Sequence, residues 1–159
     1  MVGSAKTEYA LRALVRLAHS NGGSLTVREI AQAEGLSLKY LERVMATLKR
    51  QGYVGSALGA KGGYRLTRPP DQIVCGDITR IFDRRALGQE ARNGRGAQAP
   101  RPEVRGGVDS LWQRTSAAVG HVLDQTTIAD LLPSAGAGQA ATAVKSYLAD
   151  CEAGYMFHI

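Results

Sequence analysis

Residues 37–51, SLKYLERVMATLKRQ, are typical of a helix with two unlike faces. One face repeats apolar residues at steps of three and four positions, namely Leu38, Leu41, Val44, Met45 and Leu48. The other face carries long donors, an aromatic ring and a hydroxyl: Lys39, Tyr40, Arg43, Thr47 and Arg50. Such side chains can reach guanine edges and phosphates in a DNA major groove, although an ordinary solvated helix face would show a similar pattern.

A shorter helix is expected immediately upstream of this stretch. Thr26 and Glu29 have the spacing of a capping box, which predicts a helix that begins at Val27. Gly35 suits a left-handed C-cap, and Ser37 can cap the helix that follows. Two helices joined by such a tight turn predict a helix-turn-helix.

The residues that follow predict a β-hairpin. Residues 53–57 and 64–67 favour two strands, with three glycines between them and Lys61 at the tip. A helix-turn-helix followed at once by a basic hairpin is a winged helix, and its wing would offer Lys61, Arg65 and Arg68 to a phosphate backbone. Some winged helices bind only protein, which remains an alternative.

Two further helices complete the expected winged-helix domain of residues 1–83. The first spans about residues 7–20, and Lys6 and Thr7 lie at its N-terminus, where backbone N–H groups favour a phosphate. Plain helix capping is a compatible explanation for both. A short helix of about residues 76–82 has Cys75 at its start. That thiol has either a lowered pKa or, as we favour, the role of a small buried residue.

The second half of the chain differs in character. Residues 84–107 contain six arginines and five glycines, which predicts a flexible loop. A long helix is expected at about residues 108–125, within a dimerisation unit of residues 108–132, and a final helix and tail at residues 133–159. The stripe of the long helix includes Leu111, Trp112, Val119 and Val122. Since a three-helix head already has a core, we expect this stripe to pack against a second copy.

The fold class is therefore mainly α with a small β-hairpin wing, a winged helix-turn-helix plus a long dimerisation helix. Proteins of this kind are usually two-fold dimers that read a pseudo-palindromic operator in double-stranded DNA. The net charge of +6 and the isoelectric point of about 9.6 suit a polyanionic partner.

Several other classes of protein are not indicated. The sequence has no apolar run long enough to span a membrane and no signal-peptide pattern, so we expect a cytoplasmic protein. It shows no nucleophile-and-base pair and no phosphate-cradling loop before a helix, so we expect no enzyme. The three histidines show no ligand spacing, and we expect no metal site and no cofactor.

The segments KTEYALRAL, SLKYLERV, GAKGGYRL, Leu111-Trp112 and TTIADL together resemble the Rrf2 (Rrf-two) family of winged-helix transcription regulators, over residues 1–132. The resemblance implies that the second helix of the motif and the wing contact DNA, and that the long helix forms a homodimer. By that likeness, the positions that read bases and phosphates are Ser37, Lys39, Tyr40, Glu42 and Arg43. Lys6, Thr7 and Thr26 at helix starts, and Lys61 and Arg65 in the wing, complete the expected DNA-binding set.

Many members of that family hold an iron–sulfur cluster through three cysteines in the loop before the long helix. Residues 84–110 of this chain contain no cysteine, and such clusters need thiolate ligands. The likeness therefore implies a regulator without its own cofactor. The alternative is an iron–sulfur or thiol redox sensor of the same family, acting through Cys75, Cys151 or cluster cysteines that Ala91 and Ala97 replace.

The segments VLDQTTIADL and GYMFHI resemble the branch of the family that represses cysteine and sulfur metabolism. That likeness implies control through a complex with cysteine synthase, which free O-acetylserine disrupts. The residues expected to bind the enzyme are Tyr155, Met156, Phe157, His158 and Ile159, with the carboxylate of Ile159 in the amino-acid site. Folding of this apolar tail back onto its own domain is the alternative.

Overall fold

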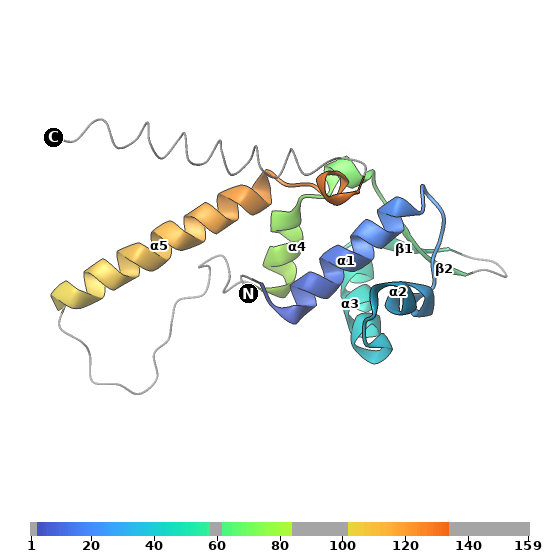
Figure 1. Ribbon diagram of the computed structural model, residues 1–159, viewed down its shortest axis with the longest axis horizontal. Coiled ribbons are helices and arrows are strands. Elements are labelled where there is room, and N and C mark those ends of the chain that lie inside the picture. Colours follow the sequence, from blue (N-terminus) through green and yellow to red (C-terminus); the bar gives the residue numbers. More distant parts are fainter. Residues whose placement is uncertain (1–2, 58–61, 84–101, 134–159) are drawn as a thin grey trace.

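A helical head, a two-stranded hairpin and a long projecting helix make up the described part of the molecule (Figure 1). The computed structural model describes residues 3–57, 62–83 and 102–133. The helices are α1 (Ala5–His19), α2 (Val27–Glu34), α3 (Leu38–Arg50), α4 (Cys75–Phe82) and α5 (Pro102–Asp124), the strands are β1 (Val54–Ala57) and β2 (Gly63–Leu66), and two short 3-10 turns are η1 (Pro70–Gln72) and η2 (Ala129–Leu131). No helix of the described ranges is both long and apolar enough to cross a membrane.

The helix-turn-helix forms where its capping residues predict it. The Thr26 hydroxyl accepts a hydrogen bond from the Glu29 N–H at 3.2 Å, and the Glu29 carboxylate accepts one from the Thr26 N–H at 2.7 Å. Gly35 ends α2 in the left-handed conformation, with φ of 63°. Ser37 stands at the N-cap of α3 but its side chain makes no capping hydrogen bond, so that expectation was wrong.

The wing is an antiparallel pair in which Val54 lies opposite Leu66 and Ala57 opposite Gly63. A third segment extends it, because the Tyr64 and Leu25 backbones exchange hydrogen bonds of 2.8 and 3.0 Å. A Cβ atom on Gly63 would lie 2.7 Å from the Leu25 carbonyl, so this close approach requires glycine. The tip, with Lys61, lies outside the described residues.

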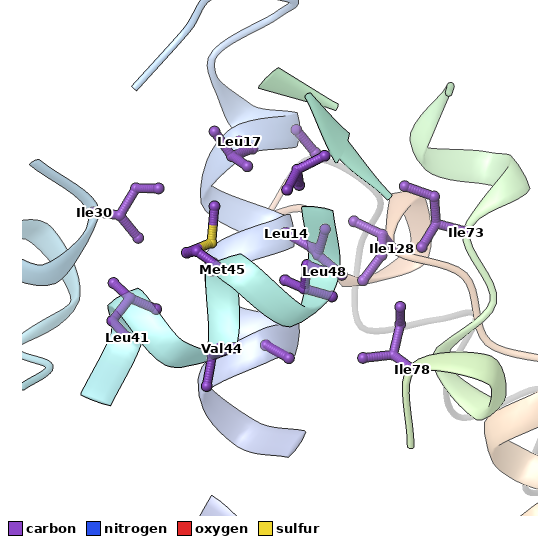
Figure 2. Packing of buried hydrophobic residues seen from close by; sticks show 14 of the residues in the cluster. Leu14, Leu17, Ile30, Leu41, Val44, Met45, Leu48, Ile73, Ile78 and Ile128 are labelled. Carbon is purple, nitrogen blue, oxygen red and sulfur yellow. The ribbon is translucent and has the colours of Figure 1, made fainter. Parts of the chain in front are cut away.

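The core lies between α1 and α3 and extends to α2, to α4 and the segment before it, and to the segment after α5 (Figure 2). Its labelled side chains are Leu14, Leu17, Ile30, Leu41, Val44, Met45, Leu48, Ile73, Ile78 and Ile128, each at most 2% exposed. The apolar stripe expected for residues 37–51 is therefore buried, apart from Leu38, which is half-buried. Its burial turns the polar side of α3 outward.

The long helix begins at Pro102, six residues before the predicted start at residue 108. The prediction of a flexible loop through residue 107 was therefore wrong for residues 102–107. Gly106 and Gly107 led to that error, since glycine costs about 1 kcal/mol in a helix interior yet is tolerated there. Proline is compatible with the first helical turn, where its missing N–H has no intrahelical partner anyway.

The segment after α5 returns into the head, which corrects the expectation that the three-helix head completes its own core. The Ile128 N–H donates to the Ile73 carbonyl at 2.9 Å, and the Cys75 N–H donates to the Thr126 carbonyl at 2.8 Å. The Ile128 side chain is fully buried in the common core. Residues 126–128, near the end of the predicted dimerisation unit, thus pack into the winged-helix domain. The predicted C-terminal helix and tail lie beyond the described residues, apart from Pro133.

Replacing Ile128 with alanine tests this shared core. We expect Ile128→Ala to lower the free energy of unfolding of the head by about 2–5 kcal/mol, because it leaves a cavity among packed side chains. Leu131→Ala, three residues away at a side chain that is 39% exposed, is the matched control and should cost about 0.5 kcal/mol or less. Urea unfolding at one fixed protein concentration measures both, and equal costs would contradict the packing of Ile128.

Candidate nucleic-acid interface

The outward face of α3 carries the side chains that the sequence assigned to DNA. Lys39, Glu42 and Arg43 are exposed, and Tyr40 is partly exposed. Leu41 and Val44, on the opposite side of the same helix, are buried. Three residues with long polar side chains therefore project from a helix whose opposite side is locked into the core. This is the arrangement by which a recognition helix reads base edges in a major groove.

Tyr40 is held in place by a residue that the sequence reasoning missed. Its ring meets the ring of Tyr9 edge to face, with centroids 4.9 Å apart and an angle of 83°. The Tyr9 hydroxyl also accepts a hydrogen bond of 3.5 Å from the Ser37 N–H, at the start of α3. Tyr9 thereby connects α1 to the first turn of α3.

A groove of about 300 Å³ runs beside this face, between the N-terminal end of α1, α3 and the end of α4. It is lined by Lys6, Tyr40, Arg43, Val44, Thr47, Arg50, Ile81 and Phe82. None of its three cations, Lys6, Arg43 and Arg50, forms an ion pair within the described part of the chain. Cations without acidic partners at a groove suit a polyanion.

The groove brings together some of the predicted residues and adds others. Lys6 and Arg43 are far apart in sequence and both line it, whereas its α4 wall, Ile81 and Phe82, was not foreseen. The Thr47 hydroxyl donates to the Arg43 carbonyl at 3.1 Å, so its proton is already used within α3.

Two of the residues predicted to contact DNA, Thr7 and Thr26, already use their hydroxyl groups in hydrogen bonds at helix starts. Thr7 is only 4% exposed, and its hydroxyl lies 3.2 Å from that of Ser4, the N-cap of α1. The Thr7 side chain is therefore covered and used at the start of α1, and its contact with a phosphate stays a prediction. The Thr26 hydroxyl donates to the Glu29 carboxylate at 2.9 Å within the capping box, so it too serves the start of a helix.

The wing is joined to the end of the recognition helix. Lys49 Nζ donates to the Ser56 hydroxyl at 2.7 Å, which ties α3 to β1, and Arg65 is exposed on β2. At the base of the wing, the Arg68 guanidinium lies 4.9 Å from the centroid of the Tyr53 ring. Burial, and secondarily the charge of Asp77, raise the pKa of the Tyr53 hydroxyl, against the opposing effect of Arg68.

The apolar stripe of α5 is open to solvent in the single chain. Val108, Leu111 and Trp112 are 48%, 57% and 48% exposed, while Val119 and Val122, nearer the head, are half-buried. Large apolar side chains grouped in this way on a projecting helix mark an interaction surface. The predicted partner-binding residues 155–159 lie outside the described residues.

Cys75 is a buried structural residue rather than a reactive thiol. Its side chain is 1% exposed, and burial, with a smaller effect of Asp130, raises its pKa to about 12. The favoured interpretation, a small buried residue, is confirmed.

Comparisons with known proteins agree on one family. The model of the Rrf2 family, described as an iron-dependent transcriptional regulator, matches residues 3–134. The transcriptional regulator CymR of Bacillus subtilis is 37% identical over 129 residues, covering 80% of this chain and 87% of that protein. Its solved structure, described as that of the global cysteine regulator, has a TM-score of 0.63 at 36% identity and covers 80% of this chain and 93% of that one. The structure of T. potens IscR has a TM-score of 0.64 at 33% identity, over 86% of this chain and 89% of that one.

The residues present do not fit the iron–sulfur cluster that the family implies. The whole sequence holds two cysteines, of which Cys75 is buried with a raised pKa. Across the described ranges, no three side chains of histidine, cysteine, aspartate or glutamate gather as metal ligands would. A cluster needs several thiolates, and this donor set does not supply them.

The family match covers most of the chain, and the relatives named above are transcriptional regulators rather than enzymes. The two-stranded wing, the capped helix-turn-helix and the long helix are the fold of their solved structures. The chain therefore belongs to the Rrf2 family of winged-helix transcriptional regulators.

Proposed function

We propose that this protein is a homodimeric repressor that binds a pseudo-palindromic operator and controls genes of cysteine and sulfur metabolism, without a cofactor of its own. The observation that carries the DNA-binding part is the basic groove beside the recognition helix. Lys6, Arg43 and Arg50 line it without ion-pair partners in the described ranges, next to the fixed ring of Tyr40.

In this proposal α3 enters the major groove and the flanking cations take the phosphates. Arg43 projects from the middle of α3 and has the reach to donate to a guanine edge. Lys6, which lines the groove from the neighbouring helix, and Arg65, which is exposed on the wing, suit phosphate contacts. Lys61 has the same proposed role, at a tip outside the described residues.

Dimerisation is proposed through α5. An apolar side chain as large as Trp112 at 48% exposure is unfavourable in a single chain, and a second copy of the same helix would cover it. A two-fold pair would present two recognition helices and thus read two inverted half-sites.

The sulfur-metabolism role rests on likeness to CymR, whose solved structure is described as that of the global cysteine regulator. The buried Cys75 thiol disfavours the thiol-sensor alternative at that position, because the thiolate is the reactive form and a pKa of about 12 suppresses it at neutral pH. Control would then come from a protein partner, and we propose cysteine synthase, contacted through residues 155–159.

The first prediction concerns base and phosphate reading, on an operator selected by the unaltered protein from random DNA. Arg43→Ala and Tyr40→Ala should each weaken specific binding by about 1–3 kcal/mol per half-site. Arg65→Ala should weaken all sequences about equally and lower the slope of log K against log salt by about 1 per half-site. Arg114→Ala removes the same charge from α5 and is the control. Gel-shift titrations in which none of the three changes matters would refute the assigned reading face.

The second concerns the dimer. Trp112→Ala should raise the dissociation constant of the homodimer by at least about 30-fold, or roughly 2 kcal/mol, because it removes a large apolar anchor from the interface. Gln113→Ala, the exposed polar neighbour on the same helix, should leave it nearly unchanged. Sedimentation velocity over a concentration series measures both, and a Trp112→Ala dimer as tight as the unaltered one argues against this interface.

The third concerns the partner. Deleting residues 155–159 should abolish binding to cysteine synthase and leave the affinity of the protein alone for DNA unchanged. Calorimetry of the enzyme with each form, with and without O-acetylserine, measures this, and O-acetylserine should release the full-length protein. Equal affinity of both forms for the enzyme would exclude these residues as the contact.

A further inference from the structure

The junction between the head and α5 is built from unusually close contacts. α5 leaves the head beside α4 (Figure 1), and its last residue is Asp124. Nη2 of Arg80, on α4, lies 2.6 Å from both carboxylate oxygens of Asp124, and Nη1 lies 3.0 Å from the Asp77 carboxylate on α4 itself. Hydrogen bonding to Asp124 is the main cause that raises the pKa of the Arg80 guanidinium.

Asp124 occupies space that only glycine leaves open. A Cβ atom on Gly76, the second residue of α4, would lie 1.9 Å from the Asp124 carboxylate oxygen. The carboxylate therefore sits directly over the first turn of α4. A side chain at position 76 would displace the Asp124 carboxylate from this place beside Arg80.

The acidic side chain of Asp124 suits the start of α4, which it faces, and not the end of α5, to which it belongs. An acidic residue is disfavoured at the C-terminus of its own helix, where the helix dipole is negative, and favoured at the N-terminus of another. At its place Asp124 meets the positive end of α4 and the Arg80 cation together. Both partners are partly exposed, at 34% and 44% of their side chains, so the pair contributes little to stability.

Small changes at this junction are amplified along α5. The helix has 23 residues and, at 1.5 Å per residue, is about 34 Å long, so a tilt of roughly 10° at its base moves the far end by about 6 Å. One base pair of DNA is about 3.4 Å long. Leu111, in the exposed apolar stripe, is 13 residues before Asp124 and so about 20 Å along the helix from it, where the same tilt produces a shift of about 3 Å, close to one base pair.

We propose that the Arg80–Asp124 pair, seated over Gly76, sets the angle at which α5 leaves the head and so selects the spacing of the two half-sites that the dimer reads. Arg80 and Asp124 are thus positioning residues, which specify the operator without touching it. This inference rests on the proposed function, since it needs a dimer formed through α5.

The test separates half-site recognition from spacing. The unaltered full-length protein first selects its operator from random DNA, and the centre spacing of that operator is then changed one base pair at a time. The measured quantity is the ratio of the dissociation constant at a shifted spacing to that at the best spacing. Asp124→Ala and Arg80→Met should lower this ratio roughly 3- to 10-fold, within the range that changes in a coupling element produce, while single half-site affinity stays the same.

Asp77→Ala is the matched control, because it also removes a carboxylate partner of Arg80 but leaves α5 untouched. It should keep the spacing profile. If Asp124→Ala and Arg80→Met keep that profile too, or lose single half-site binding in parallel, the inference is overturned while the proposed function stands. If the unaltered protein selects no paired half-sites at all, the proposed dimeric function fails and the inference falls with it.

Discussion

Packing of the apolar stripe of α3 against α1 is the interaction on which the rest of the structure depends. Leu41, Val44, Met45 and Leu48 are at most 2% exposed, and together they leave α3 no freedom to rotate about its axis. Because residues one or two positions apart on a helix point in different directions, fixing this stripe also fixes where Lys39 and Arg43 point. The DNA-reading face is therefore a consequence of core packing, and the edge-to-face contact of Tyr9 with Tyr40 adds a second constraint at the start of the helix.

Basic side chains that form ion pairs within the head differ from those that have no acidic partner among the described residues and can bind a ligand. Arg12 lies 3.1 Å from the Glu34 carboxylate and 3.7 Å from that of Glu8, and so joins α1 to the end of α2. Lys6, Arg43 and Arg50, in contrast, have no acidic partner within the described residues and line one groove. Like charges brought together without counterions repel one another, and a polyanion would relieve that repulsion. This contrast within one small head supports a nucleic-acid ligand more specifically than the net charge of +6 does.

Much of this fold could be predicted from sequence because its determinants are local. The capping box of Thr26 and Glu29, the left-handed Gly35 and the apolar period of α3 each act within a few residues, and each was confirmed. The features that escaped prediction are contacts between distant segments: the Tyr9 ring against Tyr40, and the α4 wall of the groove. Residues 102–107 were misread for a different reason. Paired glycines suit a loop as well as a helix, and Gly106 and Gly107 continue α5 although both are exposed, so neither composition nor packing around them predicts the helix start.

The return of the chain through Ile128 changes how the two halves of the molecule relate. Sequence composition suggested a boundary at residue 83, yet the backbone bonds from Ile128 to Ile73 and from Cys75 to Thr126 join segments on either side of it. The entropic cost of closing the intervening stretch rises only slowly with its length, so a long insertion between core segments is tolerable. Burial of Ile128 then favours packing of its segment against the head. Without that packing, apolar surface on Ile73 and Ile78 would be exposed to water. The segment that follows α5 is thus bonded into the domain that carries α3, and the core that orients α3 also anchors the base of α5.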